Sequence, residues 1–158
     1  MLTDPLMLLY LDGAGSNGDN PNENLARELM ELFTLGVGNY AEDDVKAGAR
    51  ALSGWRVDWE NNEAWFEPDA HYDRPLTFLG TRARFGVDEV VDAVCDHAAC
   101  AVHVATRLHT HLVGVEPEPD EAERLARVFR SADLEILPLV EAIVRSIQAL
   151  QQATKGGM

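Results

Sequence analysis

Positive charge is scarce in this sequence. It has 13 Lys and Arg residues against 27 Asp and Glu residues, and its formal net charge at pH 7 is −14. Only Lys46 and Lys155 are lysines. Nucleic acids and anionic membrane surfaces are bound through basic patches, so this balance argues against both as partners. Cationic ligands, divalent ions and basic protein surfaces stay open as partners.

Cysteines, long apolar runs and known catalytic signatures are also scarce. Cys95 and Cys100 are the only cysteines, so no disulfide framework is expected and each is interpreted as a small core residue. No apolar run reaches the roughly 20 residues of a membrane span, and no signal peptide opens the sequence. The absence of a Gly-rich phosphate loop and of a Gly-x-Ser-x-Gly motif leaves nucleotide binding and α/β-hydrolase chemistry without support. The sequence therefore assigns no cofactor and no metal ligand set.

What is present predicts a helical protein. Hydrophobic residues make up 46% of the chain, enough for a core, and several segments repeat them with helical spacing. We expect an all-α fold, a compact multi-helix bundle-like domain over residues 1–151, followed by a disordered tail at 152–158. One exception is expected at about residues 55–82, where all three tryptophans predict a long aromatic loop or a small hairpin.

The segment from Asn20 to Gly36 has the clearest helical pattern. Asn20 can cap the helix, Pro21 suits its first position, and Gly36 can end it in the left-handed conformation. Six residues are expected to share one apolar face: Leu25, Ala26, Leu29, Met30, Leu32 and Phe33.

The opposite, polar face of this helix allows two interpretations. Arg27 lies four residues from both Glu23 and Glu31, so one interpretation is a solvated surface of ion pairs. Alternatively, oxygen-bearing side chains there form a polar pocket or a cation site. The residues of that candidate site are Asn22, Glu23, Asn24, Arg27, Glu28 and Glu31.

His71 is the histidine most suited to chemistry, because Asp69 and Asp73 flank it within the aromatic segment. A neighbouring carboxylate can orient an imidazole and raise its pKa. The alternative is a loop histidine hydrogen-bonded for structure. Trp65 and Asp73 are candidate ligand-binding residues of the same segment.

Several motifs together resemble a known family. The longest is Asn22-Glu23-Asn24-x-Ala26-Arg27-Glu28-Leu29-x-Glu31-Leu32-x-Thr34-Leu35-Gly36, followed by Asp44-Val45 and Ala49-Arg50-Ala51-Leu52-x-Gly54-Trp55. Asp4-Pro5-x-Met7-Leu8-Leu9-Tyr10-Leu11-Asp12 precedes it, and His71 and Thr77-Phe78-Leu79-Gly80 follow it. From about Leu2 to Ile147 the chain resembles the bacterial domain-of-unknown-function family 1800.

The resemblance implies a mostly helical protein of the bacterial periplasm or exterior, often encoded beside a sulfatase-like partner, with no established activity. It also implies that the chain is the C-terminal portion of a longer protein whose N-terminal half is absent from this sequence. Two departures from the family pattern lie in the segment from His71 to Gly80. Tyr72 stands where the family has Asp, and Leu76 stands where it has Lys, although Asp73 is close enough to replace the Asp.

Two classes of function follow. The first is a non-catalytic envelope or extracellular module that binds a protein, such as the sulfatase-like neighbour, or an envelope polymer. The second is a carboxylate- or metal-dependent hydrolase with Glu28 or Glu31 as acid–base and His71 assisting. Carboxylates three residues apart on a helix have Cβ atoms about 5–6 Å apart, near the separation in retaining glycosidases.

Overall fold

The computed structural model describes residues 2–155 and forms two compact units, Met1–His97 and Ala98–Met158. Helices account for 56% of the chain, and two small antiparallel sheets accompany them. The prediction of an all-α fold is therefore wrong. The prediction of one domain over residues 1–151 stays a prediction, because compact units need not fold separately.

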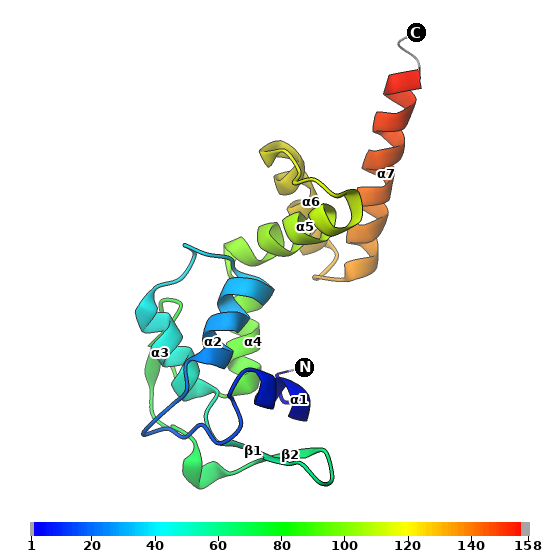
Figure 1. The fold of residues 1–158 in the computed structure, drawn as a ribbon. Coiled ribbons are helices and arrows are strands. Elements are labelled where there is room, and N and C mark those ends of the chain that lie inside the picture. Colours follow the sequence, from blue (N-terminus) through cyan, green and yellow to red (C-terminus); the bar gives the residue numbers. More distant parts are fainter. Residues whose placement is uncertain (1, 156–158) are drawn as a thin grey trace. The chain divides into compact units, whose positions relative to one another are not determined.

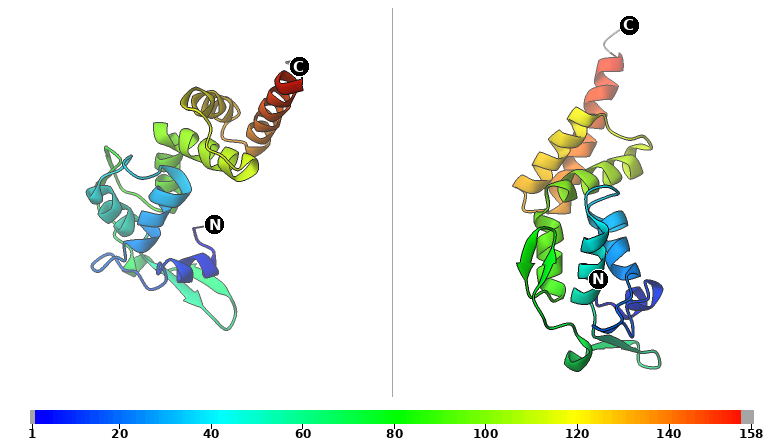
Figure 2. Two further views of the ribbon diagram at one scale, coloured as in Figure 1. Left: turned by 45° about the horizontal axis from the view of Figure 1, so that its top comes forward. Right: turned by 90° about the vertical axis from the view of Figure 1, so that its left-hand side faces the viewer.

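Four α-helices and one π-helix form the helical part of the first unit (Figure 1). They are α1 (Pro5–Tyr10), α2 (Asn24–Glu28), the π-helix η1 (Leu29–Thr34), α3 (Glu42–Ala51) and α4 (Val87–Asp96). Asp4 caps α1, since its Oδ1 accepts hydrogen bonds from the backbone N–H groups of Leu6 and Met7 at 3.0 and 3.2 Å. The views in Figures 1 and 2 both place α2 beside α3 and α1 beside the first hairpin.

The two sheets account for the difference from an all-α fold. Strands β1 (Trp55–Asp58) and β2 (Glu63–Phe66) pair antiparallel, with Trp55 opposite Phe66 and Arg56 opposite Trp65. A short 3₁₀ turn, η2 (Pro68–Ala70), precedes the second hairpin, β3 (Leu76–Phe78) and β4 (Thr81–Ala83). Aromatic and β-branched residues favour strands, and here they outweigh the helical preference of the flanking chain. Of the two sequence alternatives for residues 55–82, the hairpin is present, and a second one follows it.

The core of the first unit lies between its helices and the β3 strand. Its largest fully buried side chains include Leu8, Met30, Leu35, Val45, Phe78, Val90 and Val94. Gly48 of α3 allows this packing, because a Cβ atom there would lie 3.2 Å from the Ala26 side chain and 3.3 Å from the Phe78 ring. Asp44 joins α3 to the second hairpin, since its two oxygens accept from the backbone N–H groups of Ala41 at 2.9 Å and Leu79 at 2.8 Å.

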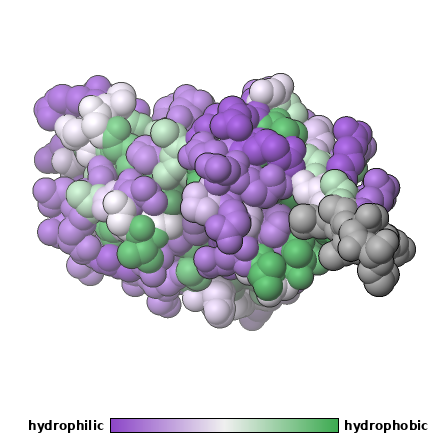
Figure 3. All heavy atoms as spheres, turned by 90° about the horizontal axis from the view of Figure 1, so that it is seen from above, coloured by the Kyte–Doolittle hydropathy of each residue, from purple (hydrophilic) through white to green (hydrophobic). Residues whose placement is uncertain are grey.

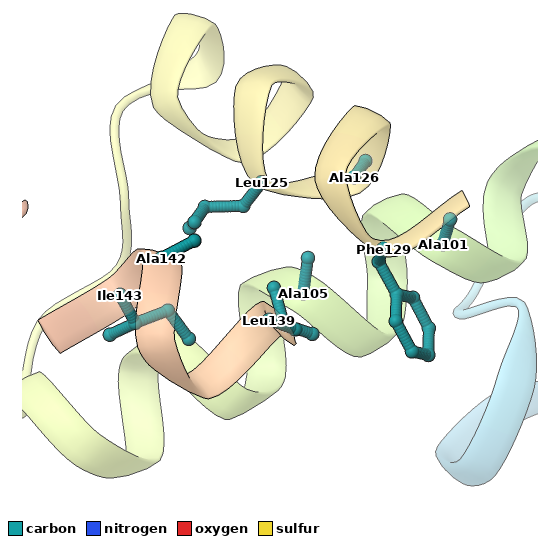
Figure 4. Close-up of a cluster of buried hydrophobic side chains, with 8 residues drawn as sticks. All are labelled: Ala101, Ala105, Leu125, Ala126, Phe129, Leu139, Ala142 and Ile143. Carbon is teal, nitrogen blue, oxygen red and sulfur yellow. The ribbon is translucent and has the colours of Figure 1, made fainter. Parts of the chain in front are cut away.

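The second unit consists of α5 (Ala98–Val113), α6 (Pro119–Ser131) and α7 (Ile136–Lys155). Figure 4 shows side chains from all three helices meeting in one cluster. Its members are Ala101, Ala105, Leu125, Ala126, Phe129, Leu139, Ala142 and Ile143.

The predicted disordered tail, 152–158, falls partly on α7, which is helical to Lys155. Residues 156–158 lie outside the described residues. Within residues 2–155, none of the helices combines the length and the apolar character that crossing a membrane requires.

Replacing Leu29 with Ala should lower the free energy of unfolding by about 2–5 kcal/mol, because Leu29 is buried and truncation leaves a cavity. The matched control is Leu32→Ala on the same helical segment. Leu32 is 43% exposed, so this substitution should lower the free energy of unfolding by less than about 1 kcal/mol. Urea unfolding monitored by circular dichroism measures both. Equal losses in the two variants would contradict the assignment of Leu29 to the core.

Candidate functional site

The predicted helix from Asn20 to Gly36 begins later than expected. It starts at Asn24, and Asn22 rather than Asn20 supports the start by accepting from the Asn24 N–H at 2.9 Å. Gly36 ends it as predicted, with φ of 81° and its N–H bonded to the Met30 carbonyl.

The second half of this helix, η1, is a π-helix. The Leu35 N–H bonds to the carbonyl of Met30, five residues back, and the Thr34 hydroxyl donates to the Leu29 carbonyl at 2.6 Å. A wider turn holds more residues and rotates those after it relative to an α-helix. The predicted apolar face therefore splits: Leu25, Ala26, Leu29 and Met30 are buried, whereas Leu32 and Phe33 are 43% and 37% exposed.

Arg27 organises the polar face of this segment. Its guanidinium pairs with Glu23 at 3.1 Å and contacts both oxygens of Glu42, at 2.7 and 3.0 Å. The hydrogen bond to Glu42 raises the pKa of Arg27, and the same bond lowers the pKa of Glu42. The ion pair with Glu23 was expected from the sequence. The second carboxylate is Glu42 of α3 and not the expected Glu31.

Glu31 instead accepts a hydrogen bond from the Tyr40 hydroxyl at 3.0 Å. Burial raises the pKa of Tyr40, and the hydrogen bond and negative charge of Glu31, together with the charge of Glu28, raise it further. Both predicted acid–base carboxylates therefore lie near one phenol. A tyrosine with a raised pKa keeps its proton at neutral pH, so Tyr40 serves there as a hydrogen-bond donor.

His71 is held in place by the corner at Ser53 and Gly54. Its Nδ1 lies 3.1 Å from the Ser53 carbonyl, which can only accept, so Nδ1 donates to it and Nε2 is the nitrogen left for another contact. The Phe66 ring lies edge-on at a centroid distance of 5.3 Å. Gly54 has φ of 96°, and a Cβ atom there would lie 3.0 Å from Phe66 and 3.1 Å from the His71 side chain.

The buried Ser53 side chain closes the same corner. Its hydroxyl donates to the Arg50 carbonyl at 2.6 Å and accepts from the Tyr72 N–H at 3.1 Å. Ser53 has no exposed surface. The sequence interpretation missed Ser53, although its position directly before the Gly54-Trp55 motif was a usable signal.

Asp73 and Trp65, the other two predicted residues, differ in their surroundings. Asp73 receives two hydrogen bonds of 2.8 Å from Arg84, so its charge is already paired. Trp65 lies on β2 and is 49% exposed. Trp65 is therefore the more available of the two for a ligand.

Three hollows adjoin these residues. One of about 300 Å³ lies beside His71, and its lining includes Asp69, Asp73 and Asn17 but not Glu28 or Glu31. A second, of about 460 Å³, is lined by Asn17, Asn22 and other residues of the 12–22 loop together with Trp59. Asn17 lines both, so the two hollows adjoin at this residue.

The third hollow, of about 830 Å³, is mainly apolar and lies between η1, α4 and the base of the first hairpin. Trp55 lines it, and the Trp55 Nε1 atom is buried with no hydrogen-bond partner among the described residues. Within residues 2–155, no group of three or more His, Cys, Asp or Glu side chains is placed to hold a metal ion.

Glu42→Gln should lower the melting temperature at pH 7, because it removes the carboxylate that pairs with Arg27. Arg27 lowers the pKa of Glu42 below its ordinary value of 4.5, so the stabilisation is present above that pH and is lost as the pH falls through the folded-state pKa. The difference from wild type should therefore narrow at pH 3 and in about 1 M salt.

Thermal melts at several pH values measure this difference. Glu60→Gln is the control, since Glu60 is exposed and no ion pair is recorded for it in the described part of the chain. A difference that stays constant from pH 7 to pH 3 would contradict the role of the Glu42 charge.

Comparison with known proteins gives one match. The model of the family described as "Protein of unknown function (DUF1800)" matches residues 1–157. No curated protein and no solved structure matches the chain. Since the family model covers nearly all of the sequence, including the Asn22–Gly36 segment, the Ser53-Gly54 corner and His71, the chain belongs to the DUF1800 family.

Proposed function

We propose that this protein is a non-catalytic binding module of the bacterial envelope or exterior, and that its first hairpin and the adjoining 12–22 loop face the ligand. The observation that carries the proposal is a contrast between two sets of side chains. Most polar groups predicted to do chemistry are engaged within the chain, whereas three aromatic groups of the hairpin are open to solvent.

The engaged set includes Arg27, Glu31 and Asp73, each of which has a charged or phenolic partner at 3.1 Å or less. In the open set, Trp59 is 67% exposed, Trp65 is 49% exposed and Phe66 is 42% exposed. Large exposed aromatic side chains contribute little to the stability of the fold, but they contribute strongly to the free energy of binding when a partner covers them.

Charge narrows the kind of partner. The net charge is −14, and Figure 3 shows one face on which hydrophilic residues cover most of the surface and hydrophobic residues form separate areas. Such a surface repels polyanions, so we infer an uncharged or basic partner. An envelope polymer fits this condition, and so does a basic surface of a protein such as the sulfatase-like neighbour.

The envelope location rests on the family resemblance and on the exposed aromatic hairpin. Aromatic residues on a short, exposed hairpin suit contact with an extended polymer, because they add contact area without requiring a deep pocket. We favour the polymer over the protein partner for that reason.

Trp65→Ala should reduce the fraction of purified protein that sediments with isolated, insoluble bacterial envelope material by about three- to tenfold, because the stacking area of one indole is lost. Trp65→Phe should restore part of it. Tyr10→Ala, which removes an aromatic side chain that is 80% exposed on α1, is the control and should sediment like wild type. A wild-type protein that stays in the supernatant would refute the proposed function.

A hydrolase stays as the second candidate because of one observation at His71. Its Nδ1 lies on the Ser53 carbonyl, which leaves Nε2 as the nitrogen available to act as a base, and His71 lines a hollow together with Asp69 and Asp73. In this alternative Asp69 and Asp73 line the same hollow as His71, whereas Glu28 and Glu31 lie by Tyr40.

Chromogenic ester and glycoside substrates distinguish the two candidates. A binding module should show no turnover above buffer with either class of substrate. Turnover by wild type that is lost in His71→Gln, with the melting temperature preserved, would establish the hydrolase instead. Asp69→Asn and Glu28→Gln would then identify which carboxylate acts with the imidazole.

A further inference from the structure

We propose that the hollow between the 12–22 loop and Trp59 is a binding site for an uncharged glycan. This inference rests on the proposed binding function and specifies the class of its ligand. The hollow has a volume of about 460 Å³, within the range of about 300–1,000 Å³ that is common for small-molecule sites. Its polar lining comes from Asp12, Ser16, Asn17, Asn20 and Asn22, and Trp59 supplies its aromatic side.

Trp59 provides a flat apolar surface at the edge of the hollow. It lies in the turn between β1 and β2, and Asp58 fixes that turn by accepting from the N–H groups of Glu60 at 2.9 Å and Asn61 at 3.2 Å. The indole itself is 67% exposed. A pyranose ring presents several C–H groups on one face, and such a face packs on an indole through dispersion and weak C–H contacts.

The asparagines provide hydrogen bonds with a defined direction. The Asn17 Oδ1 accepts from the N–H groups of Asp19 at 3.2 Å and Asn20 at 2.9 Å, and the Asn22 Oδ1 accepts from Asn24 at 2.9 Å. With both amide oxygens engaged, each Nδ2 group is left as a donor, and no partner is recorded for either within residues 2–155. The Asp12 carboxylate lines the same hollow and can accept from two hydroxyl groups.

The amide donors of the 12–22 loop and the Trp59 indole keep fixed relative positions, because the loop is hydrogen-bonded to the base of the first hairpin. The Gly15 N–H bonds to the Trp55 carbonyl at 3.0 Å, and Arg56 donates to the Ser16 carbonyl at 3.2 Å. The Ser16 hydroxyl in turn accepts from the Asn22 N–H at 3.0 Å. A site whose groups are already ordered loses less conformational entropy when it binds a ligand.

The charges select an uncharged glycan over an acidic one. Asp12 lines the hollow, Asp19 lines the adjoining hollow beside His71, and the whole chain has a net charge of −14. No Lys or Arg lines this hollow to neutralise a uronate, phosphate or sulfate group. Neutral hydroxyl groups match the amide donors and the carboxylate acceptor, whereas an anionic group would meet repulsion.

Native gel electrophoresis in the presence of soluble polysaccharides tests this inference. The probes are three neutral polymers, mixed-linkage β-glucan, galactomannan and dextran, and the polyanion alginate as comparison. The wild-type protein should be retarded by at least one neutral polymer and not by alginate. Trp59→Ala and Asn20→Ala should each raise the Kd for that polymer by about three- to tenfold, the loss expected for one stacking or hydrogen-bonding group.

Two substitutions outside the hollow serve as controls. Tyr10→Ala removes an exposed aromatic group of α1, and Gln148→Ala removes an exposed amide of the second unit, so neither should change the retardation. Trp59→Phe should recover part of the affinity if stacking is the cause. Circular dichroism and melting temperature verify that each variant is folded.

The outcomes separate this inference from the proposed function. Sedimentation with envelope material without retardation by any neutral polymer overturns the glycan site and leaves the binding function standing. Retardation that Trp59→Ala and Asn20→Ala do not weaken, or retardation by alginate alone, also overturns the site. A protein that neither sediments nor is retarded refutes both.

Discussion

The buried corner at Ser53 and Gly54 connects most of the first unit. The Ser53 hydroxyl and carbonyl bond to the end of α3, to Tyr72 and to His71, and the Gly54 N–H bonds to the Ser16 carbonyl. Leaving one buried backbone N–H without a partner costs about 1–3 kcal/mol. These few bonds therefore fix the first hairpin, the segment around His71 and the 12–22 loop relative to one another.

The proposed binding surface, formed by the 12–22 loop and Trp59, depends on this corner, although most of the surface residues are at least partly exposed. The 12–22 loop has no regular secondary structure, yet its backbone is fixed at Gly15, Ser16 and Gly18 by bonds to Trp55, Gly54 and Ala70. Gly18 must lack a side chain, because a Cβ atom there would lie 2.9 Å from the Tyr72 backbone nitrogen. Loops that carry binding residues in this way rely on a rigid scaffold for their precision.

Local patterns in the sequence predicted part of the local structure. Gly36 ends its helix as expected, the pairing of Arg27 with Glu23 follows from their four-residue spacing, and the tryptophan-rich segment forms the hairpin that was one of its two alternatives. The π-helix was not predictable, because helical periodicity assumes a constant turn. Its consequence is that Leu32 and Phe33 leave the expected apolar face.

The contacts between distant segments account for the other differences. Arg27 meets Glu42, Tyr40 meets Glu31 and His71 meets Ser53, and each of these pairs joins residues 9 to 18 positions apart in the sequence. Spacing within one helix carries no information about such pairs. The same limit applies to the 12–22 loop, which the fold brings beside Trp59.

The second unit has a core in which half of the eight clustered residues are alanines, contributed by all three of its helices. Alanine has no side-chain rotamers, so these helices approach closely without losing side-chain entropy on folding. The same close approach leaves no room for a larger side chain in place of one of these alanines. The methyl groups around it cannot change rotamer to make space, so a larger residue would strain the packing. Sequence variation in this unit should therefore be confined to its outer faces, while Ala101, Ala105, Ala126 and Ala142 accept few substitutions other than glycine or serine.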